Sequence, residues 1–184
     1  MQRDSHARDG LTRYGTHVHY TAMQTAYVET SVISHAAARA SRVARIALLQ
    51  EEARRWWAEC RPHDRVLTSQ FVIDEASVGD PDAVARRLEM LADVPVMQNV
   101  QPVFDLAEAL ISRRLIPIEA KLDAFHVASA VIAGVDYLVT QNCTHIANAA
   151  TIPAIYSMLD SLGFGPVLIC TPAELLGEID NGTQ

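Results

Sequence analysis

Short apolar segments alternate along this chain with longer amphipathic ones, and this alternation limits the fold more than any other feature. The short segments are rich in β-branched and aromatic residues, which favour strands. They cover residues 26–29, 65–71, 94–98, 136–140 and 166–170. Segments with helical spacing of apolar residues cover 41–60, 81–91, 102–114, 118–133 and 152–162. Strands that alternate with helices form a parallel sheet covered on both faces, so the sequence predicts an α/β fold with a five-stranded, mainly parallel sheet.

Glycine and proline indicate where some of these helices begin and end. After the second apolar segment, a short helical turn is expected to end at Gly79. Asp80 then caps a new helix that Pro81 opens, because proline suits the first helical position. Gly134 follows the longest apolar helix, at the position that favours a left-handed cap.

Length and patterning together predict one domain. The chain has 184 residues, of which 49% are hydrophobic, enough for one sizeable core but not comfortably for two. The first part of the chain is polar and has no clear period, so we expect a poorly ordered extension at 1–24. The domain is then expected at 25–177 and a C-terminal tail at 178–184.

Charge and cysteine content exclude several classes of protein. The formal net charge is −7, which argues against a protein that coats nucleic acid through bulk positive charge, although not against an enzyme that acts on it locally. The three cysteines are far apart and form no CxxC pair, so neither a disulfide framework nor a zinc knuckle is indicated. No run approaches the roughly 18 apolar residues of a membrane span. We therefore expect a cytoplasmic protein without a membrane segment.

Polar side chains occur at the ends of core segments rather than along solvent-facing surfaces. Glu29 follows the first predicted strand, Glu75 follows the second, Asp123 lies in the first turns of the long helix, and TQNCTH at 140–145 follows the fourth strand. The carboxyl ends of parallel strands lie along one edge of a sheet, so these groups can converge there. Converging carboxylates repel one another, and a hard divalent cation such as Mg²⁺ or Mn²⁺ would relieve that repulsion.

Each of these acids also has a simpler interpretation. Glu29 can be a carboxylate at a helix N-terminus, stabilised by the helix dipole. Asp123 can belong to a water-facing stripe with Glu119 and His126. Adjacent residues point about 100° apart on a helix, so Asp74 and Glu75 cannot both join one site, and Glu75 is the one we select. His126 and His145 are expected to be hydrogen-bonded structural histidines rather than ligands.

Three segments, in this order, carry a resemblance to a known family: YVETSVIS, SQFVIDEA and LDAFHVASAVIAGVDYLVTQN. Together they resemble the PIN domain, the nuclease fold of VapC-type toxins and related ribonucleases. The resemblance covers residues 26–176. It implies a three-layer α/β/α sandwich with acids gathered at one sheet edge around one or two Mg²⁺ or Mn²⁺ ions.

The resemblance also implies roles for individual residues. The first three acids of the family fall on Glu29, Glu75 and Asp123, which would be metal ligands. The fourth falls on Asn142, which would be a further catalytic residue that ligates the ion or orients a coordinated water, or would instead cap the turn after the fourth strand. The supporting hydroxyls fall on Thr30 and Thr140. Two positions depart from the pattern, because the first acid is usually Asp and the fourth is an acid rather than an amide. A site with three carboxylates should hold a cation more weakly than a site with four.

The activity implied by the resemblance is metal-dependent hydrolysis of an RNA phosphodiester. Its implied partners are an RNA substrate, a small cognate antitoxin and a second copy of the chain in a homodimer. The alternative is a PIN-like binding module with degraded chemistry, whose acidic pocket accepts a basic segment of a partner. A phosphoacceptor domain would need an Asp on a central strand and a Lys after the last strand, and neither is visible.

Overall fold

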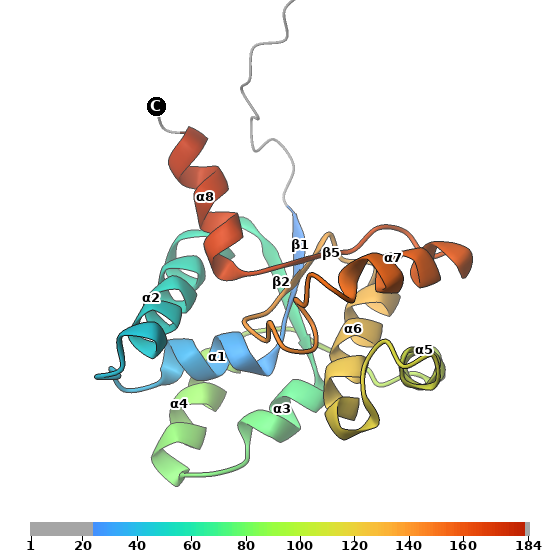
Figure 1. Cartoon of the computed structure of the whole chain (residues 1–184). Helices are drawn as coiled ribbons and strands as arrows, with labels where there is room; N and C mark the ends of the chain where they lie inside the picture. Colours follow the sequence, from blue (N-terminus) through green and yellow to red (C-terminus); the bar gives the residue numbers. More distant parts are fainter. Residues whose placement is uncertain (1–23, 183–184) are drawn as a thin grey trace, which may run out of the picture.

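The structure is a computed structural model that describes residues 24–182 (Figure 1). Of the expected N-terminal extension, only Gln24 lies within the described residues. Among residues 24–182, none of the helices combines the length and the apolar character that a membrane span requires.

A five-stranded parallel sheet forms the centre of the molecule. Its strands are β1 (Thr25–Val28), β2 (Arg65–Ser69), β3 (Val96–Met97), β4 (Tyr137–Val139) and β5 (Leu168–Cys170). They lie in the order β3-β2-β1-β4-β5, and all four pairs are parallel. Ala26, Tyr27 and Val28 of the central strand β1 are fully buried, as expected for a strand covered on both faces. The predicted α/β class and the five-stranded parallel sheet are confirmed.

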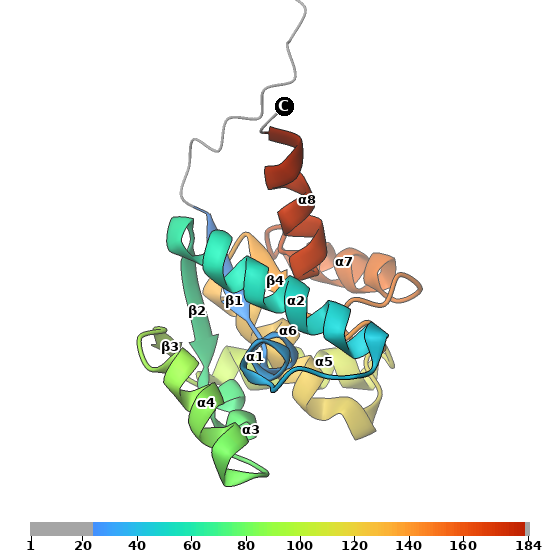
Figure 2. The same ribbon diagram turned by 90° about the vertical axis from the view of Figure 1, so that its left-hand side faces the viewer.

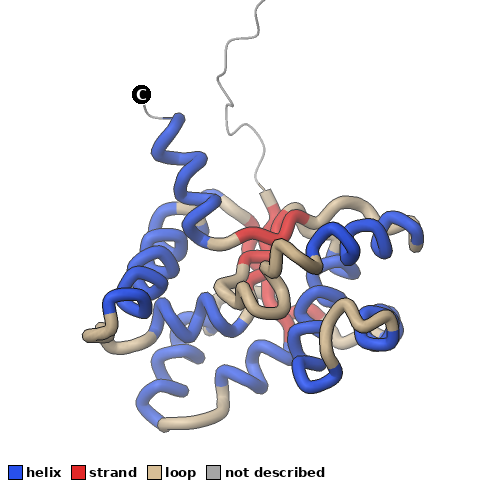
Figure 3. Tube along the Cα trace, in the orientation of Figure 1, coloured by secondary structure: helices blue, strands red, loops and turns tan. Residues whose placement is uncertain are grey.

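Helices cover both faces of this sheet. They are α1 (Thr30–Ala37), α2 (Ala44–Glu59), α3 (Gln70–Ala76), α4 (Pro81–Leu91), α5 (Gln101–Ser112), α6 (Lys121–Ala133), α7 (Ile152–Ser161) and α8 (Pro172–Gly182). Short 3₁₀ turns lie at Arg61–His63 and Ile118–Ala120. In Figure 1, α1, α2, α4 and α8 lie on one side of the strands and α5, α6 and α7 on the other. Figure 2 shows α2 crossing in front of β1 and β4, and Figure 3 shows the strands enclosed between helical layers. The arrangement is a three-layer α/β/α sandwich.

The predicted start of α4 and the predicted end of α6 agree with the structure, whereas α3 ends at Ala76, before Gly79. Asp80 caps α4 by accepting the backbone N–H of Ala83 at 3.0 Å, and Pro81 is the first residue of that helix. Gly134 ends α6 in the left-handed conformation, with φ of 64°. These local signals succeeded because they depend on the backbone of one or two residues rather than on tertiary contacts.

Two helices lie outside the expected ranges, and several strands are shorter than expected. Helix α1 lies outside the expected helical ranges, although one interpretation of Glu29 placed that residue at a helix N-terminus: α1 starts directly after Glu29, and its first apolar residue is Val32. The second strand ends at Ser69 instead of Phe71, because Gln70 already begins α3. Helix α8 was not predicted either, and it continues to Gly182, beyond the expected domain end at residue 177.

Candidate functional site

Glu29 lies at the junction of β1 and α1 and caps that helix. Its side chain is 3% exposed, and its Oε2 accepts the backbone N–H of Ser31 at 2.8 Å. The Ser31 hydroxyl donates to the other carboxylate oxygen, Oε1. A carboxylate at a helix N-terminus is stabilised by the unpaired N–H groups and by the helix dipole. The helix-capping interpretation of Glu29 therefore holds. The role of the same carboxylate as a metal ligand stays a prediction.

Ser31 also connects this junction to the loop after β4. Its hydroxyl accepts the backbone N–H of Gln141 at 2.8 Å. The buried Gln141 side chain accepts from Nδ1 of His35 at 2.7 Å and donates to the carbonyl of Leu49 at 2.9 Å. The loop that follows β4 is thus held against both α1 and α2 by side chains.

Glu75 lies in the last turn of α3 and is held by two other helices. The Thr30 hydroxyl of α1 donates to Oε2 of Glu75 at 2.6 Å, and Nε2 of His126 on α6 lies 2.6 Å from the same oxygen. The Glu75 side chain is 29% exposed, whereas that of His126 is 1% exposed. Thr30 follows Glu29 directly in the sequence and is hydrogen-bonded to Glu75, so it connects the first two predicted acids.

The pKa of the Glu75 carboxyl lies below its ordinary value of 4.5. Burial acts in the opposite direction and raises this pKa, but the hydrogen bond and charge of His126, together with the hydrogen bond from Thr30, lower it by more. Glu75 is therefore an ionised carboxylate at neutral pH.

The other ring nitrogen of His126 reaches the central strands. Its Nδ1 lies 3.0 Å from the hydroxyl of Tyr27, and that hydroxyl lies 2.7 Å from Oγ of Ser69. Tyr27 and Ser69 are both fully buried. Burial raises the pKa of Tyr27 above its ordinary value of 10.0, so its side chain is a neutral phenol. Neither residue was predicted from the sequence, although a tyrosine and a serine within apolar strands are the kind of signal that could have indicated them.

Asp123 lies one turn before His126 on α6, on the same side of the helix. Its Oδ2 lies 2.8 Å from Nδ1 of His145, and its side chain is 17% exposed. His126 and His145 are thus hydrogen-bonded, as expected. The sequence did not indicate that the partners of these histidines are two of the predicted acids, Glu75 for His126 and Asp123 for His145.

Asn142 stabilises the turn after β4 with its side-chain oxygen. Oδ1 accepts the backbone N–H groups of Thr144 and His145, each at 3.2 Å. The Thr140 hydroxyl accepts the backbone N–H of Asn142 at 2.9 Å. Both residues therefore shape the loop that carries His145 toward Asp123.

The three predicted acids are connected through neighbouring residues. Glu29 is followed by Thr30, Thr30 binds Glu75, and Glu75 binds His126, which lies one turn from Asp123. Within the residues that the structure describes, no three His, Cys, Asp or Glu side chains are already grouped as a metal site. In the same part of the chain, no Lys or Arg forms an ion pair with any of the three carboxylates. Carboxylate oxygens without a basic side chain as partner are donors of the kind that suits Mg²⁺ or Mn²⁺.

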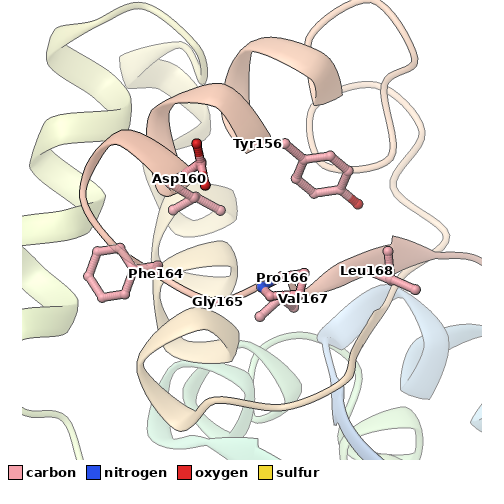
Figure 4. Close-up of a pocket in the computed structure, with 8 residues that line it drawn as sticks. Tyr156, Asp160, Phe164, Gly165, Pro166, Val167 and Leu168 are labelled. Carbon is pink, nitrogen blue, oxygen red and sulfur yellow. The ribbon is translucent and has the colours of Figure 1, made fainter.

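An apolar pocket of about 360 Å³ lies apart from these acids, between α7 and β5 (Figure 4). Its lining runs from Tyr156 on α7 through Phe164 and Pro166 to Leu168 at the start of β5. None of the acids or histidines described above lines this pocket.

Comparisons of the chain with protein-family models, with curated proteins and with solved structures found no match.

Replacing Glu75 by Gln should flatten the acid limb of the stability curve. The folded-state pKa of Glu75 is lowered. The unfolded chain therefore takes up this proton first as the pH falls below about 4.5. The stabilisation from Glu75 is complete above the unfolded pKa and is lost as the pH falls through the folded pKa. Between about pH 6 and pH 3, the Tm of the wild type should fall more steeply than that of Glu75→Gln.

The control for this measurement is Glu108→Gln, which changes an exposed acid on α5 in the same way. Its Tm should follow the wild-type curve. Parallel curves for wild type and Glu75→Gln would show that the contacts of Glu75 do not favour its ionised form.

Two substitutions of Asn142 separate a role in the turn from a role in a cation site. Asn142→Ala removes the oxygen that accepts from Thr144 and His145, and should lower the free energy of unfolding by about 1 kcal/mol. Asn142→Asp keeps that oxygen and should leave stability nearly unchanged, since Asp and Asn cap about equally well. Because the oxygen is used by the turn, we expect calorimetric Mn²⁺ affinity of Asn142→Asp to stay within about threefold of wild type. A tenfold or larger rise would instead show that position 142 faces the cation.

Proposed function

We propose that this protein is a metal-dependent ribonuclease of the PIN type, with Glu29, Glu75 and Asp123 as the residues that hold Mg²⁺ or Mn²⁺. The observation that carries the proposal is the linked set of three carboxylates without a Lys or Arg partner in the described part of the chain. Glu29 comes from the end of β1, Glu75 from α3 and Asp123 from α6. Their donor chemistry supports a hard divalent cation as the common partner.

Each residue of the site has a definite task in this proposal. A bound divalent cation would lower the pKa of a water molecule and stabilise negative charge on a phosphate group. Thr30 and His126 orient Glu75 through its Oε2. His145 orients Asp123, and Asn142 and Thr140 hold the loop from which His145 extends.

The proposal includes the partners that the resemblance to PIN domains implies. They are an RNA substrate, a small cognate antitoxin and a second copy of the chain, all in the cytoplasm. A net charge of −7 disfavours tight binding of RNA through bulk charge, so recognition would depend on the cation and on local contacts.

A binding module without catalytic activity is the second candidate function. Both carboxylate oxygens of Glu29 are already bonded to Ser31, and the side-chain oxygen of Asn142 is used by its own turn. These contacts favour a pocket whose remaining acids, Glu75 and Asp123, accept an Arg or Lys of a partner protein. Such a module would bind a basic peptide without cleaving RNA.

Cleavage of single-stranded RNA by the purified protein tests the proposal. We expect cleavage with Mg²⁺ or Mn²⁺ and none after chelation of the ion. Asp123→Ala should reduce the rate at least about 100-fold, because even residues that only orient a metal ligand contribute up to about that factor. The matched control is Asp105→Ala, which removes an exposed carboxylate from the neighbouring helix α5 and should retain wild-type activity.

Two results would contradict the proposal. Equal activity of Asp123→Ala and wild type, both purified from a nuclease-free host, would show that the cleavage does not come from this site. Binding of a basic peptide by the wild type, with no RNA cleavage under any metal condition, would favour the binding module.

A further inference from the structure

A chain of hydrogen-bonded side chains runs through the core of the molecule and ends at Glu75. It starts at Ser69 at the end of β2 and passes through Tyr27 on β1 and His126 on α6. Ser69 and Tyr27 are fully buried, and His126 is 1% exposed. Glu75 is the one member whose side chain reaches the surface, at 29% exposure.

The identity of the groups fixes the direction of the last hydrogen bond. An ionised carboxylate can only accept, so Nε2 of His126 carries the proton and donates to Oε2 of Glu75. With a neutral ring, Nδ1 accepts from the Tyr27 hydroxyl, which in turn accepts from Ser69. With a charged ring, Nδ1 donates to Tyr27 and Tyr27 donates to Ser69. In both states Nε2 of His126 donates to Glu75, so this hydrogen bond forms whether or not the ring is charged.

Packing alone does not explain why these hydrogen-bonded polar side chains lie in the core. A buried hydroxyl or imidazole gives little net stability over an apolar residue of similar shape, and it destabilises the fold when its hydrogen-bond partner is missing. Three consecutive buried polar groups therefore restrict one another to a single arrangement more than they strengthen the core. The last of these groups, His126, is hydrogen-bonded to Oε2 of the partly exposed Glu75, and Thr30 donates to the same oxygen. The buried groups therefore also restrict the position of the Glu75 carboxylate.

We propose that Tyr27 and His126 are positioning residues, which hold Glu75 so that its second oxygen, Oε1, is presented to the cation. Among the described residues, the hydrogen bonds of this carboxylate, from Thr30 and His126, both fall on Oε2, which leaves Oε1 as the oxygen for a metal. This inference rests on the proposed function, since it explains the buried hydrogen-bonded side chains as a support for the metal ligand Glu75. Hydrogen-bonded partners behind a metal ligand typically contribute 10- to 100-fold to metal affinity.

The test is the Mn²⁺ affinity of Tyr27→Phe, measured by calorimetry with Mn²⁺ alone. The substitution keeps the ring and removes the hydroxyl, and we expect the dissociation constant to rise about tenfold. The matched control is Tyr156→Phe, which removes a hydroxyl that accepts the backbone N–H of Ile169 at 2.8 Å, away from the acids. The control should lose stability without a change in Mn²⁺ affinity beyond about twofold, because a structural role does not reach the metal.

His126 gives a second test, by rescue. His126→Ala removes the donor to Glu75 and should weaken Mn²⁺ binding at least as much as Tyr27→Phe. His126→Gln places an amide N–H at a similar distance along the side chain and should restore part of the affinity. Equal Mn²⁺ affinity of wild type and Tyr27→Phe would overturn the inference, and the proposed function would stand.

A measurement without metal separates failure of the inference from failure of the proposed function. If the wild type binds no Mn²⁺, the metal assignment fails. The hydrogen bond from His126 to Glu75 can still be observed through the NMR signal of the Nε2–H proton of His126. This signal is identified by its loss in His126→Gln. A slowly exchanging signal in the wild type and in Tyr156→Phe, lost in Tyr27→Phe, supports the positioning role. An unchanged signal in Tyr27→Phe overturns it.

Discussion

One carboxylate oxygen, Oε2 of Glu75, joins three helices that are far apart in the sequence. It accepts from Thr30 at the start of α1 and from His126 on α6, while Glu75 itself ends α3. Through Thr30 the junction reaches the cap of α1 at Glu29, and through His126 it reaches the central strand at Tyr27. The positions of the predicted site residues relative to one another depend on this junction, because Thr30 adjoins Glu29 and His126 lies one turn from Asp123.

The sequence predicted most of the sheet but not every helix. The strands were recognisable because short β-branched segments alternate with helical ones, and Gly134 and Asp80 mark helix ends through their own backbone preferences. Helix α1 was left out of the expected helices because it has only eight residues and begins directly after β1, with no glycine or proline between them. Its signal was the polar residues Glu29, Thr30 and Ser31, which interrupt the apolar pattern and fit a helix N-terminus.

The candidate site was predictable in its acids and not in their partners. Glu29, Glu75 and Asp123 could be selected because a charge at the end of a core segment is unusual, whatever the fold. The contacts of His126 with Tyr27 and Glu75 could not, because these residues lie 99 and 51 positions away and share no local pattern. For Asn142 the sequence left two roles open, and the observed contacts are those of a residue that stabilises its own turn.

The central claim is that the three carboxylates share one divalent cation, and anomalous X-ray scattering from crystals soaked in Mn²⁺ tests it most directly. The account predicts a single strong Mn²⁺ peak at this edge of the sheet, within about 2.5 Å of oxygens of Glu75 and Asp123, and of Glu29 if its cap opens to the ion. The same crystals of Asp123→Ala should lose the peak. A well-occupied Mn²⁺ site elsewhere on the molecule, or no site at saturating Mn²⁺, would contradict the claim.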